Sequence, residues 1–267
     1  MKFLKYVLKS LLRDRRTLTW SVFFSLSLEF FSIFYLNRMN DINAGLVRQA
    51  SGLMYSLMLM MSMAFSSVAI GRSFVEQSRS FGYIFRFSKM NGKSYLIQLV
   101  GGVATVYIIL SGLFVLFTVF MFDMKYSTLV FPRNLAELVL FSMLGGMSIL
   151  GTTLVVDQLV LKFQGRRNLN FIQFLPVFLY FTFDWAIIEG GAHGSEFYMS
   201  PFLSSTYLMI NAYGGTSSFW FNVSTPYTVN LLLSVISVVS WVTSLMLLDA
   251  FILKGIYLTP EEEERVV

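Results

Sequence analysis

Residues 99–122 read LVGGVATVYIILSGLFVLFTVFMF, and these 24 consecutive positions contain no charged side chain. An α-helix rises about 1.5 Å per residue, so a helix of this length exceeds the roughly 30 Å of the hydrocarbon core of a bilayer. A run this long and this apolar is typical of a transmembrane helix rather than of a buried helix in a soluble domain. The stretch therefore predicts one membrane span.

Five further windows of similar length and apolarity lie on either side of it. Over the whole chain of 267 residues, 55% are hydrophobic and 13% are charged, with a mean hydropathy of +0.66, which is far from the balance of a soluble domain. We predict an all-α integral membrane protein, a single domain over residues 1–267, with six transmembrane helices at about 17–36, 51–70, 99–122, 135–156, 169–188 and 227–250.

The basic residues are distributed unequally between the two sides that six spans define. Sixteen of the 20 Lys and Arg fall in the terminal segments and in the loops near 85 and 165, and only Arg38, Arg48, Lys125 and Arg133 fall on the other side. The positive-inside rule then predicts cytoplasmic N and C termini, including a tail at 255–267, in a multi-pass plasma membrane protein. The net charge of +5 follows from this topology, so we expect no nucleic-acid partner.

Residue types that build most catalytic or metal centres are scarce. The chain has no Cys and one His, which excludes disulfides, thiolate ligands and histidine clusters. No paired carboxylates and no Ser with a base converge at one predicted depth, so we expect neither an enzymatic activity nor a cofactor.

Two cytoplasmic segments have the composition of contact surfaces. Residues 1–16 form an amphipathic interface helix, which either anchors and orients the chain on the bilayer or also contacts a partner. Residues 71–98 interleave aromatic and basic side chains, and a short helix within them would present Phe81, Ile84 and Phe85 as an apolar knob for a partner or for the membrane surface. Arg79 and Arg86 would steer the docking of that knob.

One acidic residue falls well inside a predicted span. Glu29 should face the bundle interior or a water-filled cavity, because a charge at the bilayer centre costs about 2.5–3.5 kcal/mol on insertion scales. It is either a carboxylate of the translocation path, as a substrate contact or proton carrier, or the partner in a structural hydrogen bond. The other acidic residues near spans lie closer to the span ends, where water and headgroups should solvate them: Asp123, Glu137, Asp157, Asp184 and Asp249.

The segment 189–226, between the fifth and sixth spans, combines a glycine-rich break with an aromatic stretch. Such a stretch fits an outer re-entrant element that dips into the membrane and returns. Its aromatic residues would form either an outer gate for an amphiphile or a packed extracellular cap: Phe197, Tyr198, Phe202 and Tyr207.

Three stretches in order along the chain are similar to the type-2 permease family of ATP-binding-cassette exporters. They are 8–20 (LKSLLRDRRTLTW), 76–98 (EQSRSFGYIFRFSKMNGKSYLIQ) and 176–213, with Ser200-Pro201 in the last. The resemblance implies an interface helix, a cytoplasmic coupling helix in which Gly82 matches the family glycine, and the re-entrant element.

The resemblance also implies a function and partners. The chain would export an amphiphile, such as a drug, a lipid or a glycan-like molecule, with ATP hydrolysed on a separate nucleotide-binding subunit. It would pair with a second copy or a paralogue in the bilayer. The alternative is a secondary transporter or channel without an ATPase, which would need charged residues spread through several spans.

Overall fold

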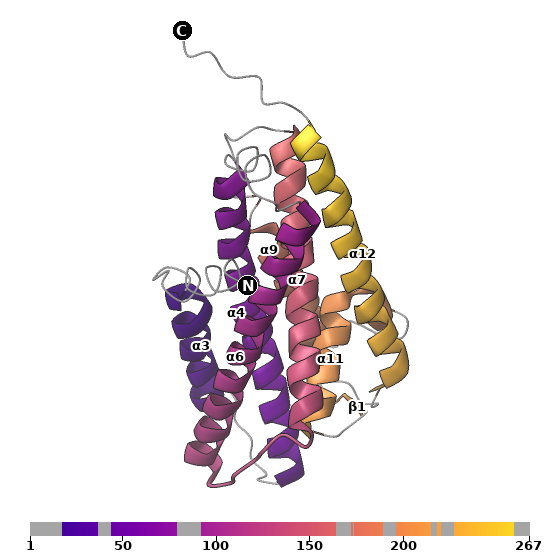
Figure 1. Ribbon diagram of the computed structural model, residues 1–267. Helices are drawn as coiled ribbons and strands as arrows, with labels where there is room; N and C mark the ends of the chain where they lie inside the picture. The colour runs from indigo at the N-terminus through magenta and orange to yellow at the C-terminus, as the bar shows by residue number, and fades with distance from the viewer. Residues whose placement is uncertain are drawn as a thin grey trace.

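The structure is a computed structural model whose described part is almost entirely helical (Figure 1). Two strands of two residues each, β1 (Ser218–Phe219) and β2 (Tyr227–Thr228), pair antiparallel before the last helix. The structure describes residues 18–36, 44–78, 92–163, 172, 174–188, 196–214, 218–219 and 227–258.

Four helices are long and apolar enough to cross a membrane. They run over Gly45–Glu76, Ser94–Tyr126, Leu135–Lys162 and Leu231–Leu253. These are the main parts of α4 (Ala44–Ser78), α6 (Gly92–Tyr126), α7 (Leu135–Phe163) and α12 (Leu231–Leu258). By length and composition the chain thus has the helices of a membrane protein, in agreement with the predicted class.

The first and fifth predicted spans are shorter helices. The first is a continuous helical path of a π-helix η1 (Leu18–Phe24), α3 (Ser25–Phe31) and a second π-helix η2 (Ser32–Leu36). The fifth is α9 (Leu175–Ile188), with 14 residues. Helix α9 is too short to cross the hydrocarbon core by itself, whereas the first path has 19 residues divided among three helical segments.

Helices α4 and α6 extend into the segment that the sequence suggested to be a loop. Residues 71–78 continue α4, and residues 92–98 begin α6. The aromatic residues of 71–98 were predicted to form a contact surface for a partner or for the membrane, and for two of them, Phe74 and Tyr95, this was wrong. The two side chains are buried with ring centroids 6.3 Å apart, because the two helix ends pack against each other.

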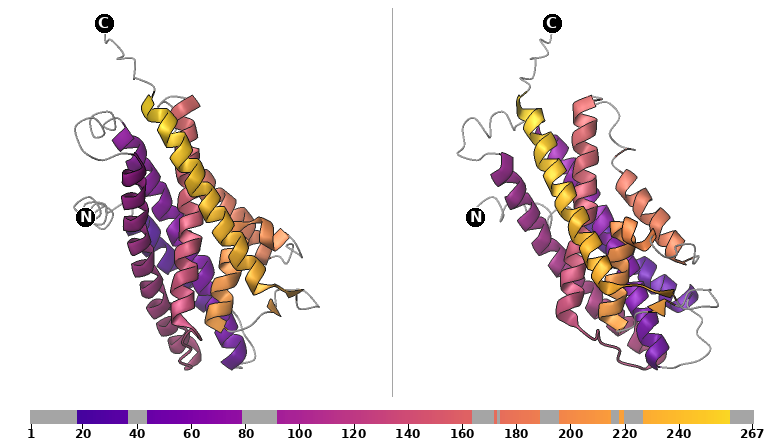
Figure 2. Two further views of the ribbon diagram at one scale, coloured as in Figure 1. Left: turned by 45° about the vertical axis from the view of Figure 1, so that its right-hand side comes forward. Right: turned by 90° about the vertical axis from the view of Figure 1, so that its right-hand side faces the viewer.

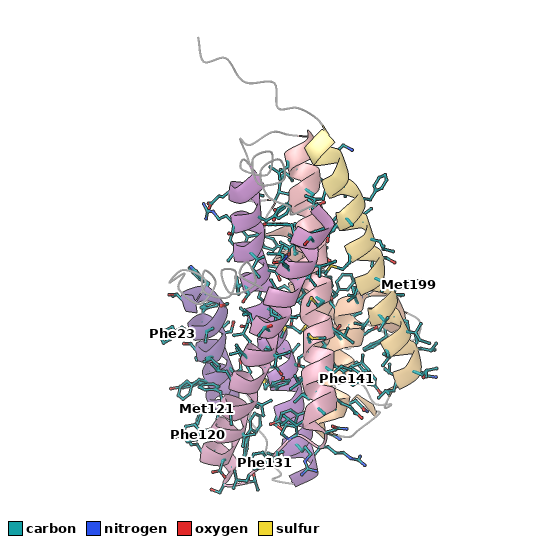
Figure 3. All side chains as sticks on the ribbon, viewed as in Figure 1. Phe23, Phe120, Met121, Phe131, Phe141 and Met199 are labelled. Atoms are coloured by element: carbon teal, nitrogen blue, oxygen red, sulfur yellow. The ribbon has the colours of Figure 1, made fainter. Side chains whose placement is uncertain are left out.

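Helix α7 lies at the centre of the bundle and contacts α4, α6, α9, α11 and α12 (Figures 1 and 2). Its close contacts depend on glycine. A Cβ on Gly146 would lie 2.5 Å from Cδ2 of Tyr107 on α6 and 2.8 Å from Sδ of Met63 on α4. The aliphatic and aromatic side chains that face away from this core surround the bundle, Phe23 and Phe120 among them (Figure 3).

Helix α11 (Pro201–Gly214) is a short helix enclosed inside the bundle, where it packs among α4, α7 and α12. It follows the one-turn helix α10 (Glu196–Met199), and Ser200 separates the two. Every residue from Pro201 to Ile210 is buried. The backbone N–H groups of Arg133 and Asn134, in the α6–α7 connection, donate to carbonyls at the far end of α11 over 3.0 and 3.1 Å.

Substituting Gly146 tests the central position of α7. Gly146→Ala should lower the free energy of unfolding by about 1–3 kcal/mol, since the new methyl group overlaps the Tyr107 ring. Gly112→Ala on α6 is the matched control: nothing lies within 4 Å of its added Cβ, so stability should stay the same or rise by up to about 1 kcal/mol. Thermal unfolding in detergent measures both. Equal midpoints for the two variants would contradict the tight α6–α7 contact.

Candidate functional site

Glu29 lies inside the bundle, as predicted. Its side chain is 0% exposed, and the Thr118 hydroxyl on α6 donates to Oε1 over 2.5 Å. Among the described residues, Oε2 has no hydrogen-bond partner. The Lys125 ammonium, two turns further along α6, donates to the Ile33 carbonyl and so fastens the end of the first helical path to α6. One carboxylate oxygen is therefore held, and the other is left for a proton or a ligand.

A hydrogen-bonded tyrosine joins α4 to α6 and α7. The Tyr55 hydroxyl on α4 lies 2.7 Å from the Ser111 hydroxyl on α6 and 3.0 Å from the Ser142 hydroxyl on α7. Tyr55 packs against Tyr213 of α11 with ring centroids 5.6 Å apart. Four helices thus meet at one polar level, which the sequence did not predict.

Further along α4 a second level of buried hydroxyls follows. The Ser67 hydroxyl lies 2.6 Å from that of Tyr107 on α6. Gly71, one turn beyond, faces Asp157 of α7. Tyr55 and Gly71 are 16 positions apart, which corresponds to about 24 Å along the helix axis. The buried polar groups therefore extend over most of the thickness of a bilayer core.

Asp157 and Asp249 occupy places that contradict the prediction of solvated span ends. Their side chains are 1% and 0% exposed, and no carboxyl oxygen of either has a hydrogen-bond partner among the described residues. The prediction failed because α7 and α12 continue to Phe163 and Leu258, beyond the predicted windows. Glu137 is exposed and Asp123 is half-buried, while the Asp184 side chain lies outside the described residues.

The predicted gate residues are packed in two places: Phe197, Tyr198 and Tyr207 belong to one small cluster, and Phe202 belongs to the main core. The ring centroids of Phe197 and Tyr207 are 6.3 Å apart, and Phe202 lies 5.8 Å from Phe183 of α9. The Tyr207 hydroxyl donates to the Val229 carbonyl over 3.1 Å, and Tyr198 Oη accepts the Asn230 N–H over 2.7 Å. This packing is what the alternative of a packed cap requires. A gating role stays a prediction.

The carbonyl groups at the α10–α11 break are hydrogen-bonded to side chains. Three consecutive carbonyls, at Phe197, Tyr198 and Met199, accept from Ser204 Oγ over 2.7 Å, Ser237 Oγ over 2.6 Å and Trp241 Nε1 over 3.1 Å. Ser200 Oγ accepts the Leu203 N–H over 3.4 Å as an N-cap of α11, with Pro201 at the first helical position. Sequence reasoning missed Ser204, Ser237 and Trp241, because isolated hydroxyl and indole groups give no periodic signal.

Several predicted residues fall outside the described part of the chain. They include the coupling residues Arg79, Phe81, Gly82, Ile84, Phe85 and Arg86, the interface helix at 1–16 and the tail from 259 onward. Within the described ranges, no three acidic or histidine side chains gather so that they could hold a metal ion.

Comparison with protein families, with curated proteins and with solved structures gives no match for this chain. What the chain does must therefore be inferred from its own residues and geometry.

Reversing the charge at position 29 tests whether Glu29 faces the interior of the bundle. Glu29→Gln keeps an acceptor for Thr118 and should fold, whereas Glu29→Lys places a cation among donors and should abolish a stable monodisperse protein. Glu137→Lys, at an exposed acidic position, is the control and should behave as wild type. Size-exclusion profiles and thermal midpoints in detergent measure all three. A normal profile for Glu29→Lys would show that Glu29 does not face the interior.

Proposed function

We propose that the chain is the transmembrane subunit of an ATP-binding-cassette exporter, which moves an amphiphilic substrate with energy from ATP hydrolysed on a separate subunit. The element α10–α11 carries the proposal. It has the properties expected of the re-entrant element between the fifth and sixth spans that the family resemblance implies.

The depth of the break supports a re-entrant path. Ser237 and Trp241, which bind the carbonyls of Tyr198 and Met199, lie six and ten positions after Leu231, or about 9 and 15 Å along α12. Non-helical backbone at membrane depth is tolerated only where protein groups satisfy it, and Ser204, Ser237 and Trp241 do so. The break therefore suits a position inside the hydrocarbon region.

The return of the chain supports the same path. Helix α11 ends where its carbonyls accept from Arg133 and Asn134, in the connection that the positive-inside rule assigns to the outside. An element that enters from the outer side, turns beside α12 and returns to the outer side does not cross the bilayer. Its aromatic packing would have to open for an amphiphile to leave through it.

The long α4–α6 pair fits a link to an ATPase. Each helix has 35 residues and so is about 52 Å long, well above the roughly 30 Å of a hydrocarbon core. The C-terminal end of α4 and the N-terminal end of α6 lie at the end of the bundle that the basic residues assign to the cytoplasm (Figure 1). We propose that residues 79–91, which follow α4 and precede α6 in the sequence, dock on the nucleotide-binding subunit.

A second function has an observation in its favour. A secondary transporter or channel needs charged groups within several spans, and Glu29, Asp157 and Asp249 are buried in three different helical segments. Coupling to an ATPase discriminates between the two functions.

The coupling residues give the direct test. Phe85→Ala should weaken the complex with the ATPase by up to roughly a hundredfold, since burial of a Phe contributes about 1.5–3 kcal/mol. The double variant Arg79→Ala, Arg86→Ala should mainly slow association and make it less dependent on salt. Co-purification and ATPase stimulation at equal membrane expression measure both effects. If no ATPase co-purifies with the wild type, the secondary transporter becomes the preferred function.

The orientation is tested with single cysteines in this cysteine-free chain. An impermeant thiol reagent should label Leu129→Cys in intact cells, because Leu129 is exposed in the α6–α7 connection. Phe85→Cys should react only after permeabilisation, and Ser200→Cys, buried at the break, should stay unlabelled in both cases. Labelling of position 85 in intact cells would reverse the orientation and remove the proposed coupling segment.

A further inference from the structure

Asp157 on α7 and Asp249 on α12 are buried where these two helices pack together, in the half of the bundle opposite to Glu29. We propose that they form a proton-binding site, and that the bound proton fastens α12 to α7. The inference goes beyond the proposed function, because it holds whether ATP or an ion gradient drives transport.

The first step is the burial of both groups without a partner. All four carboxyl oxygens are inaccessible to solvent and lack hydrogen-bond partners among the described residues. Gln158, next to Asp157, is also fully buried, and both its amide atoms lack a partner there. An isolated ionised carboxylate is too costly to keep in such a place, whereas a carboxylic acid is not.

The second step is the proximity of the two acidic groups. Leu245 and Ile252 of α12, on either side of Asp249 in the sequence, form one buried cluster with Val155 of α7, two positions before Asp157, so both carboxyl groups lie at one level of the α7–α12 contact. Ionisation of both would place two uncompensated negative charges in this apolar contact, so at least one of them binds a proton. The proton comes from water at the nearer end of the bundle, and no other reactant is needed.

The third step is the absence of a compensating cation within the described residues. Helix α4 contributes Arg72, which is exposed and paired with Glu76 over 3.7 Å. Helix α7 contributes Lys162, which is exposed, and α6 contributes the buried phenol of Tyr95. Neither Asp157 nor Asp249 has an ion pair or a hydrogen bond in this part of the chain.

The fourth step is the lack of space around the pair. A Cβ on Gly71 would lie 2.0 Å from Oδ2 of Asp157 and 2.9 Å from Cγ2 of Thr153, so the carboxyl fills the space that a side chain of α4 would take. Nearby on α7, a Cβ added to Gly151 would lie 2.9 Å from Cβ of Leu245 on α12. Hydration of an ionised pair therefore requires that a helix moves.

We assign the movement to the second half of α12. Its first half is held to α10 through Ser237 and Trp241, but its second half exposes Leu247, Leu248 and Phe251 on the outside. Loss of the proton should thus separate the second half of α12 from α7 while the first half stays in place.

Infrared spectroscopy and spin-label distances test the proposal on the full chain in nanodiscs, without any ATPase. In the Glu29→Gln background, which removes the other buried carboxyl group of the described residues, a carboxylic-acid band should disappear between about pH 5 and about pH 9, and it should be missing in the double variant Asp157→Asn, Asp249→Asn. Asp123→Asn, at a half-buried acidic residue near the other end of α6, is the control and should keep the band. These spectra do not depend on transport. A negative spectroscopic result would therefore contradict the proton-binding site without contradicting the proposed export function.

The distance measurement uses spin labels on cysteines at two pairs of exposed positions. The pair Leu159 and Phe251 reports the second half of α12, and the pair Leu140 and Ile236 reports the first half. Over the same pH range only the first of these distances should widen, by more than about 2 Å, and Asp157→Asn with Asp249→Asn should keep it short throughout.

Three results would overturn the proposal. The first is a carboxylic-acid band that survives in the double Asn variant in the Glu29→Gln background, and the second is widening of the Leu159–Phe251 distance that persists in the double Asn variant. The third is widening on removal of sodium or potassium at constant pH, because a metal cation would then occupy the site.

Discussion

Close packing around α7 is the constraint on which the other features of the bundle depend. Gly146 lets Tyr107 and Met63 approach the α7 backbone, and Gly151 does the same for Leu245 of α12. In lipid, helices associate through such close van der Waals contact and through hydrogen bonds, because lipid chains are as apolar as the side chains they replace. Without these contacts, Tyr55 on α4 would not reach the hydroxyl groups of both α6 and α7.

The buried polar groups differ in how far their hydrogen bonds are satisfied. Thr118 holds one carboxyl oxygen of Glu29 while Oε2 has no partner among the described residues, and the Tyr55 hydroxyl joins α4 to α6 and α7, so hydrogen bonds between helices stabilise one arrangement here. At Asp157 and Asp249 the carboxyl groups have no such donors among the described residues. The hydrogen bonds near Glu29 should hold the helices in one arrangement. The packing around Asp157 and Asp249 should instead depend on whether a proton is bound. The proposed movement is therefore assigned to the end of the bundle where α7 meets the second half of α12.

The sequence predicted those features that depend on long runs of apolar residues. The run at 99–122 lies within α6, and the placement of Glu29 in the interior followed from its position inside an apolar window. Asp157 was misplaced because hydropathy windows end at charged residues, whereas α7 continues to Phe163 on its packing. Helix α11 could not be predicted as a buried helix from periodicity, because apolar and hydroxyl side chains occupy all its faces.

The enclosure of α11 also bears on how the chain assembles. A helix of 14 residues with several hydroxyl groups is too short to enter a bilayer as an independent span. It can be placed only after α4 and α7 have formed the surface on which it lies, and α12 then covers it. Membrane insertion and tertiary folding are thus separate events for this chain. Helix α12 is translated last, and it completes a bundle whose other helices have already been made. Truncation before α12 should leave a species that is inserted in the membrane but exposes α11 to quality-control proteases.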